Sequence, residues 1–89
     1  MKGKPHNSRL QAIYLEVVEN QLRDNDPSET RQTLDRLRSL GYNERDAKML
    51  IASAVAAETF EIMKKQEPFK EDRYIRNLRR LPDQSFEEE

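Results

Sequence analysis

The chain has 89 residues, of which 35% are hydrophobic and 37% are charged, so it can form one domain with a small core. Its 16 basic and 17 acidic side chains nearly cancel, which excludes a whole-molecule field that would draw the protein onto nucleic acid or an anionic membrane. The absence of cysteine excludes disulfides and thiolate metal sites and favours a reducing compartment.

The first predicted helix covers residues 8–23, where apolar residues recur at a spacing of three and four and therefore share one face. These residues are Leu10, Ile13, Tyr14, Val17, Val18 and Leu22. Asn7 or Ser8 is expected to cap the helix, because both side chains can accept a hydrogen bond from its first turn.

The second predicted helix covers residues 27–40. Asp26 is expected to cap it, Pro27 to occupy its first position and Glu29 to complete a capping box. Its buried stripe is narrow and consists of Leu34, Leu37 and Leu40, with Thr30 and Thr33 beside them. Gly41 is expected to end the helix in the left-handed conformation.

The third predicted helix covers residues 44–66, begins after Asn43 and is stopped by Pro68. It is the most apolar segment, so we expect it to be the centre of the fold, with two apolar faces. The stronger face carries Ala47, Leu50, Ile51, Ala54, Val55 and Ile62. The second face carries Met49, Ala52, Ala56, Phe60 and Met63.

The fourth predicted helix covers residues 71–80 and is closed by Pro82. Its inward residues are Tyr74, Ile75, Leu78 and Leu81. The chain contains only two glycines and no long alternating segment, so the fold class is all-α. We predict one domain over residues 7–82, a compact antiparallel bundle of about four helices with a long central third helix.

The two ends of the chain are polar. Residues 1–6 form a basic arm and residues 83–89 an acidic tail, and we expect both to be disordered. The only histidine, His6, lies in the arm and has no nucleophile or orienting carboxylate nearby. The basic start has no apolar run long enough for a signal peptide or a membrane span, so we expect a cytoplasmic protein that does not bind membranes.

Several short motifs are distributed along the predicted helices. They are Asn7, Leu10, Glu19, Gln21, the pair Asp26-Pro27, the pair Asp46-Ala47, Glu58, and Tyr74 followed by Leu78 and Leu81-Pro82. In these residues the chain resembles a bacterial family of small helical proteins of unknown function that carries an Asn-Pro-x-Leu-His motif. Where the family pattern has histidines, this chain has Gln11, Leu15 and Met49. Three inward histidines and a glutamate would suit a metal site in a bundle, so the departures predict no bound metal and no cofactor.

Two polar residues fall on predicted apolar faces. Glu58 lies in the middle of the stronger face of the third helix, and Gln21 lies among the apolar residues of the first helix. A lone buried carboxylate is costly, so we expect the two side chains to meet in a hydrogen bond that a tyrosine hydroxyl completes. The pair is interpreted either as a structural contact that sets helix register or as the remnant of a ligand pocket.

Four arginines gather on the outer side of the fourth helix: Arg73, Arg76, Arg79 and Arg80. Such a face could bind phosphates. The region lacks interleaved aromatic residues and a second basic element, so the alternative is a solvated helix face whose cations suit the C-terminal end of the helix dipole.

No nucleophile, phosphate-binding loop or acid–base pair is recognisable, so we do not expect an enzyme. The first hypothesis is a protein–protein interaction module or small homodimer that uses the second face of the third helix: Met49, Ala52, Ala56, Phe60 and Met63. Within that face Met49, Ala52 and Ala56 should be left uncovered. The second hypothesis is weak nucleic-acid binding through the four arginines. The third is a degenerate ligand pocket around Gln21 and Glu58.

Overall fold

The computed structural model describes residues 8–86, which form four helices: α1 (Ser8–Asp24), α2 (Ser28–Ser39), α3 (Glu44–Lys65) and α4 (Glu71–Arg80). These residues contain no strand, so the predicted all-α fold with a long third helix is confirmed. Each helix boundary agrees with the predicted one to within one residue. None of the described helices is both long and apolar enough to cross a membrane.

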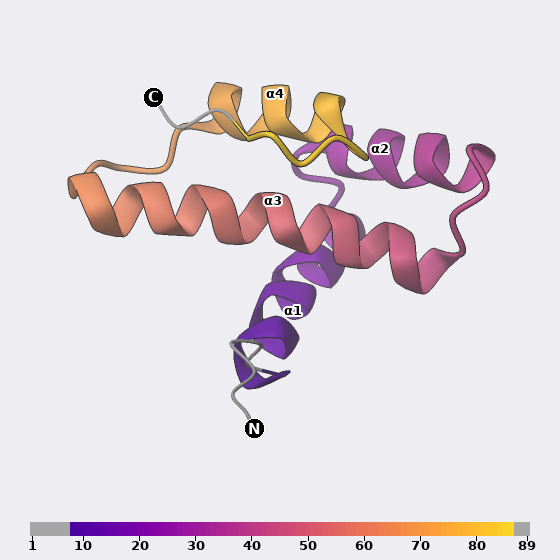
Figure 1. The fold of residues 1–89 in the computed structure, drawn as a ribbon, viewed down its shortest axis with the longest axis horizontal. Coiled ribbons are helices and arrows are strands. Elements are labelled where there is room, and N and C mark those ends of the chain that lie inside the picture. The colour runs from indigo at the N-terminus through magenta and orange to yellow at the C-terminus, as the bar shows by residue number, and fades with distance from the viewer. Residues whose placement is uncertain (1–7, 87–89) are drawn as a thin grey trace.

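The third helix, α3, is the centre of the fold and packs against each of the other three helices. Helices α2 and α4 lie along one side of α3, whereas α1 crosses α3 and extends beyond it (Figure 1). The C-terminal end of α1 meets α2, and its N-terminal half points away from the other helices (Figure 1). This crossing decides which apolar residues the fold covers.

The core lies where all four helices meet. Its buried apolar residues are Val18, Leu22, Leu34, Leu37, Ala47, Ile51, Ala52, Ala54, Val55, Tyr74, Leu78 and Leu81. Leu10 and Ile13 were expected on the buried face of α1 but are 47% and 48% exposed. That expectation is wrong because α1 crosses α3 instead of packing along it (Figure 1), so α3 covers only part of the face that carries them. Leu40, expected in the stripe of α2, is exposed at the end of that helix.

Two predicted helix ends are confirmed. The side chain of Asn43 caps α3, since its oxygen accepts a hydrogen bond of 2.7 Å from the backbone nitrogen of Asp46. Gly41 follows α2 with a φ of 111°, a left-handed backbone that favours glycine.

The predicted cap of α2 is wrong. Pro27 occupies the N-cap position and no side chain caps the helix. The backbone nitrogen of Asp26 instead donates to the carbonyl of Gln21 at 3.1 Å, which holds Asp26 in the turn that ends α1.

The acidic tail was expected to be disordered from residue 83, but the structure places residues 83–86 against the helices. Gln84 donates a hydrogen bond of 2.9 Å to the hydroxyl of Ser53, and Arg80 donates one of 2.7 Å to the carbonyl of Ser85. The ring of Phe86 packs against the core, which gives this part of the tail an apolar anchor. Residues 87–89 and the basic arm with His6 lie outside the described residues.

Candidate functional site

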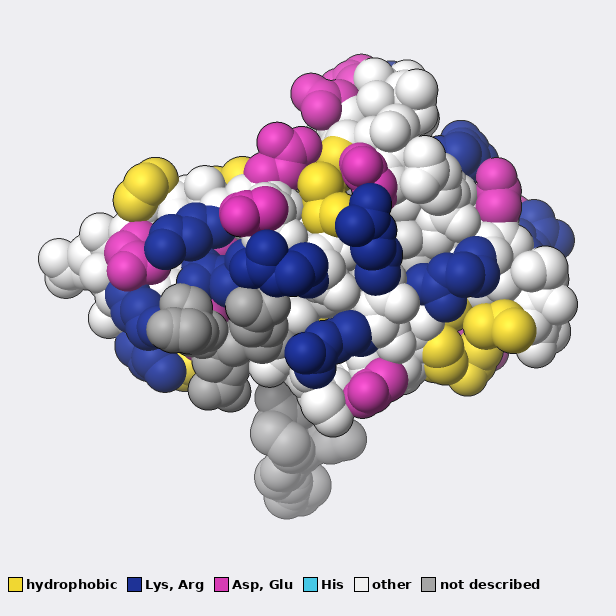
Figure 2. All heavy atoms as spheres, turned by 90° about the horizontal axis from the view of Figure 1, so that it is seen from above, with side chains coloured by type: hydrophobic (Ala, Val, Ile, Leu, Met, Phe, Trp, Pro, Cys, Tyr) yellow, Lys and Arg dark blue, Asp and Glu magenta, His cyan; other side chains and the backbone are white. Residues whose placement is uncertain are grey.

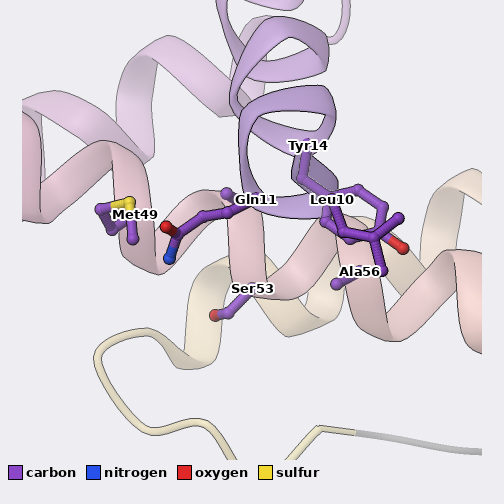
Figure 3. Close-up of a pocket in the computed structure, with 7 residues that line it drawn as sticks. Leu10, Gln11, Tyr14, Met49, Ser53 and Ala56 are labelled. Carbon is purple, nitrogen blue, oxygen red and sulfur yellow. The ribbon is translucent and has the colours of Figure 1, made fainter. Parts of the chain in front are cut away.

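The predicted partner surface on α3 is divided by α1. Met49, Ala52 and Ala56 line a cavity of about 240 Å³ together with Leu10 and Tyr14 of α1 (Figure 3). Ala52 is buried, and Met49 and Ala56 are half-buried. We expected these three residues of α3 to be left over by the other helices. This is wrong for Ala52, because α1 crosses α3 over it, whereas Met49 and Ala56 are only partly covered.

The rest of the predicted surface is open. Phe60 and Met63 are 60% and 72% exposed, and on α1 Leu10 and Ile13 are exposed as well. Leu10 borders the same cavity as Ala56, and Phe60 follows Ala56 by one helical turn. The four exposed residues therefore form a surface around the junction of the two helices. We call Leu10, Ile13, Phe60 and Met63 the apolar strip.

Charged side chains lie beside both halves of the apolar strip, the half on α1 and the half on α3. On α1, the exposed Glu16 lies one turn after Ile13. On α3, the ammonium of Lys64 lies 5.4 Å from the centre of the Phe60 ring, within the range of a cation–π contact. The α1 half is thus bordered by the carboxylate of Glu16 and by the guanidinium of Arg9, one turn before Ile13. The α3 half is bordered by the ammonium of Lys64, which also lies 3.8 Å from the carboxylate of Glu61.

Gln21 does not form the predicted hydrogen bond with Glu58. Its side-chain oxygen accepts hydrogen bonds from the hydroxyls of Thr30, at 2.7 Å, and Tyr74, at 2.8 Å. The tyrosine hydroxyl is therefore present as predicted. Burial raises the pKa of Tyr74 to about 12. This group ties α1 to α2 and α4.

Glu58 is buried as predicted, with 2% exposure, but its partner is Arg73. The guanidinium binds both carboxylate oxygens, with Nε 2.9 Å from Oε1 and Nη2 2.8 Å from Oε2. The backbone nitrogen of Lys70 adds a third hydrogen bond of 3.1 Å to Oε2. Arg73 is itself 1% exposed, so α3 and α4 share a fully buried, two-pronged ion pair.

The two polar residues that the sequence singled out nevertheless border one cavity. Gln21 and Glu58 line a space of about 180 Å³ between α1, α3 and α4. Its apolar walls are formed by Val17, Val55, Ile62, Phe69 and Tyr74. Gln21 and Glu58 therefore line the same cavity without bonding to each other.

The predicted basic patch loses Arg73, whose side chain points into the protein toward Glu58. Arg76, Arg79 and Arg80 remain on the outer face of α4. Arg76 lies 3.6 Å from the carboxylate of Asp72, and a carboxylate of α2 lies 4.0 Å from Arg79. Figure 2 shows basic side chains on this face interspersed with acidic ones. The patch is smaller and more neutralised than the sequence indicated.

Only two of the three positions where the resemblance implies histidines lie in one cavity, and Glu58 is in another. Gln11 and Met49 line the 240 Å³ cavity (Figure 3), Leu15 borders a different pocket, and Glu58 lies in the 180 Å³ cavity. Among residues 8–86, no three His, Cys, Asp or Glu side chains are placed to hold a metal ion. Within residues 8–86, Glu58 is therefore not part of a cluster that could bind a metal ion.

Two important arginines were missed by sequence reasoning. Arg73 was assigned to the solvated face, although its place next to Tyr74 in the helix was a signal that it could turn inward. Arg36 of α2 donates hydrogen bonds to the carbonyl oxygens of Leu81, at 2.7 Å, and Leu78, at 3.0 Å. It satisfies the C-terminal end of α4 from a neighbouring helix, and no local pattern indicates such a contact.

Comparison with known proteins finds no protein family, no curated protein and no solved structure that matches this chain.

Proposed function

We propose that this protein is a non-catalytic interaction module that pairs with a second copy of itself through the apolar strip. The observation that carries the proposal is the clustering of exposed apolar side chains. Six large hydrophobic residues are exposed among the described residues, and four of them belong to the apolar strip. Single exposed apolar residues are ordinary on protein surfaces, whereas a group on one surface indicates a contact site.

The charges beside the apolar strip favour a second copy as the partner. A two-fold axis would place the α1 half of one protomer on the α3 half of the other, and it would do so twice. Glu16 of each protomer would then approach Lys64 of the other, so the charges at the rim of the contact are complementary.

The size of the apolar strip predicts a weak dimer. Fully burying a large apolar side chain contributes about 1.5–3 kcal/mol, and these side chains are about half to three-quarters exposed, so each would contribute roughly 1–2 kcal/mol. Eight such side chains in a dimer contribute on the order of 10 kcal/mol, against an association cost of about 4–15 kcal/mol. We therefore expect a dissociation constant in the micromolar range or weaker.

Sedimentation equilibrium over concentrations of about 10–500 μM tests the proposal. The wild type should shift from monomer to dimer, and Phe60→Asp should abolish the shift by burying a charge at the contact. Leu40→Asp is the matched control, because Leu40 is equally exposed but lies at the end of α2, outside the apolar strip. Its dimerisation should be unchanged.

Charge reversal tests the arrangement of the two protomers. Glu16→Lys and Lys64→Glu should each weaken dimerisation, and the double variant should restore it because the opposite charges meet again. A wild type that stays monomeric would show that the partner is not a second copy. A double variant no better than the single ones would show that Glu16 and Lys64 do not meet across the contact.

The nucleic-acid alternative has less support. The guanidinium of Arg73 is paired with Glu58, and Arg76 and Arg79 each lie within 4.0 Å of a carboxylate. A contact with so few phosphates would be weak and strongly dependent on salt.

A further inference from the structure

Two polar side chains that line the 180 Å³ cavity between α1, α3 and α4 have hydrogen-bonding capacity that contacts within the protein do not use. The side-chain oxygen of Gln21 is held by the hydroxyls of Thr30 and Tyr74. Because that oxygen is fixed by two donors, the orientation of the amide group is set, and its nitrogen points away from both hydroxyls. Among the described residues this nitrogen has no hydrogen-bond partner, so it offers two donors.

Glu58 supplies an acceptor to the same cavity. Its carboxylate accepts three hydrogen bonds, two from Arg73 and one from the backbone of Lys70. A carboxylate has about four acceptor sites, so about one remains. The ion pair also holds the carboxylate in place, because both of its oxygens are bound.

We infer that this cavity binds a small neutral molecule with an apolar body and a primary carboxamide head. The carboxamide oxygen would accept from the Gln21 amide, and its N–H would donate to Glu58. The apolar body would lie against Val17, Ile62 and the ring of Phe69, which lies 5.8 Å from that of Tyr74 between ring centres. Pockets that combine apolar walls with a few fixed polar groups are the usual form of small-molecule sites.

The volume and charge of the cavity define the ligand further. A cavity of about 150 Å³ accommodates a molecule the size of benzene, so 180 Å³ suits a single ring with a small head. A ligand with a carboxylate in place of the carboxamide would bring a second negative charge to Glu58 and would have no N–H to donate to it. A plain hydrocarbon would leave the Gln21 amide without a partner.

Titration of the ¹⁵N-labelled protein with benzamide, followed by NMR, tests the inference. We expect saturable shifts of Val17, Thr59, Ile62 and Phe69 with a dissociation constant on the order of 1 mM. Benzoate and toluene should bind at least about tenfold more weakly, because neither can bond to both polar groups.

Gln21→Glu keeps the side-chain oxygen but replaces the donors with a second acceptor, so benzamide binding should weaken at least about tenfold. Gln11→Glu is the same change on the same helix outside the cavity, and it should leave binding unchanged. If Gln21→Glu is unfolded by circular dichroism, Val17→Phe, which fills the cavity with an apolar ring, should abolish binding instead.

The absence of saturable shifts, equal binding of toluene and benzamide, or full binding by the folded Gln21→Glu or Val17→Phe variant would overturn the inference. These outcomes do not depend on the oligomeric state, because none of the cavity residues belongs to the apolar strip.

Discussion

Replacing Arg73 with methionine removes the guanidinium that contacts the buried Glu58 carboxylate. The carboxylate would keep only the backbone N–H of Lys70. Methionine is long enough to fill much of the space, so the main effect is the uncompensated charge and not a cavity.

Leaving one member of a buried ion pair without its partner costs about 3–5 kcal/mol. A chain of this length is expected to have a total unfolding free energy of about 4–13 kcal/mol, at 0.05–0.15 kcal/mol per residue. Arg73→Met should therefore remove a large fraction of the stability. The double variant Arg73→Met with Glu58→Leu should be much more stable than Arg73→Met alone, because the unpaired charge of Glu58 is removed as well.

Urea unfolding followed by circular dichroism measures these differences. Arg76→Met is the matched control, since Arg76 lies one turn further along α4 with an exposed ion pair to Asp72, and it should cost less than about 1 kcal/mol. If Arg73→Met costs no more than Arg76→Met, or if the effects at Arg73 and Glu58 are additive, the ion pair does not hold α3 and α4 together.

Two further predictions concern hydroxyl and guanidinium groups that join the helices. Burial raises the pKa of Tyr74 from 10.0 to about 12, so its folded state retains the proton more tightly. The resulting contribution of about 2–3 kcal/mol is fully present below pH 10 and is lost as the pH rises to about 12. The unfolding free energies of the wild type and of Tyr74→Phe, measured as a function of pH, should converge over that range. A difference between them that does not change with pH would refute the shift. Arg36→Met should lower the unfolding free energy by about 1.5–3 kcal/mol, because the carbonyls of Leu78 and Leu81 lose a charged donor. Arg38→Met, which removes an exposed pair with a 3.7 Å separation, should cost under about 1 kcal/mol in the same urea experiment.

The helix boundaries were predictable because they depend on neighbouring residues. Asn43 caps α3 through a contact three residues away, and Gly41 ends α2 through its own backbone conformation. Asp26 shows the limit of that reasoning. Its sequence context suited a cap, but the turn that follows α1 engages its backbone with Gln21.

The candidate site was predictable only in part. The positions of Gln21 and Glu58 on apolar faces indicated that both meet unusual surroundings, and both border the same cavity. Their hydrogen-bond partners come from residues 9 to 53 positions away in the chain. Helical periodicity places a residue on a face, but it does not say which side chain of another helix lies opposite.

Helix content, helix length and the burial of Glu58 followed from the sequence, because caps and apolar spacing act over a few residues. The tertiary structure alone decided that α1 crosses α3 and extends past it (Figure 1), which covers Ala52 and leaves Leu10 and Phe60 in solvent. It also decided that Arg73 turns inward, since only the approach of α4 to α3 supplies the carboxylate that offsets the cost of burying its charge.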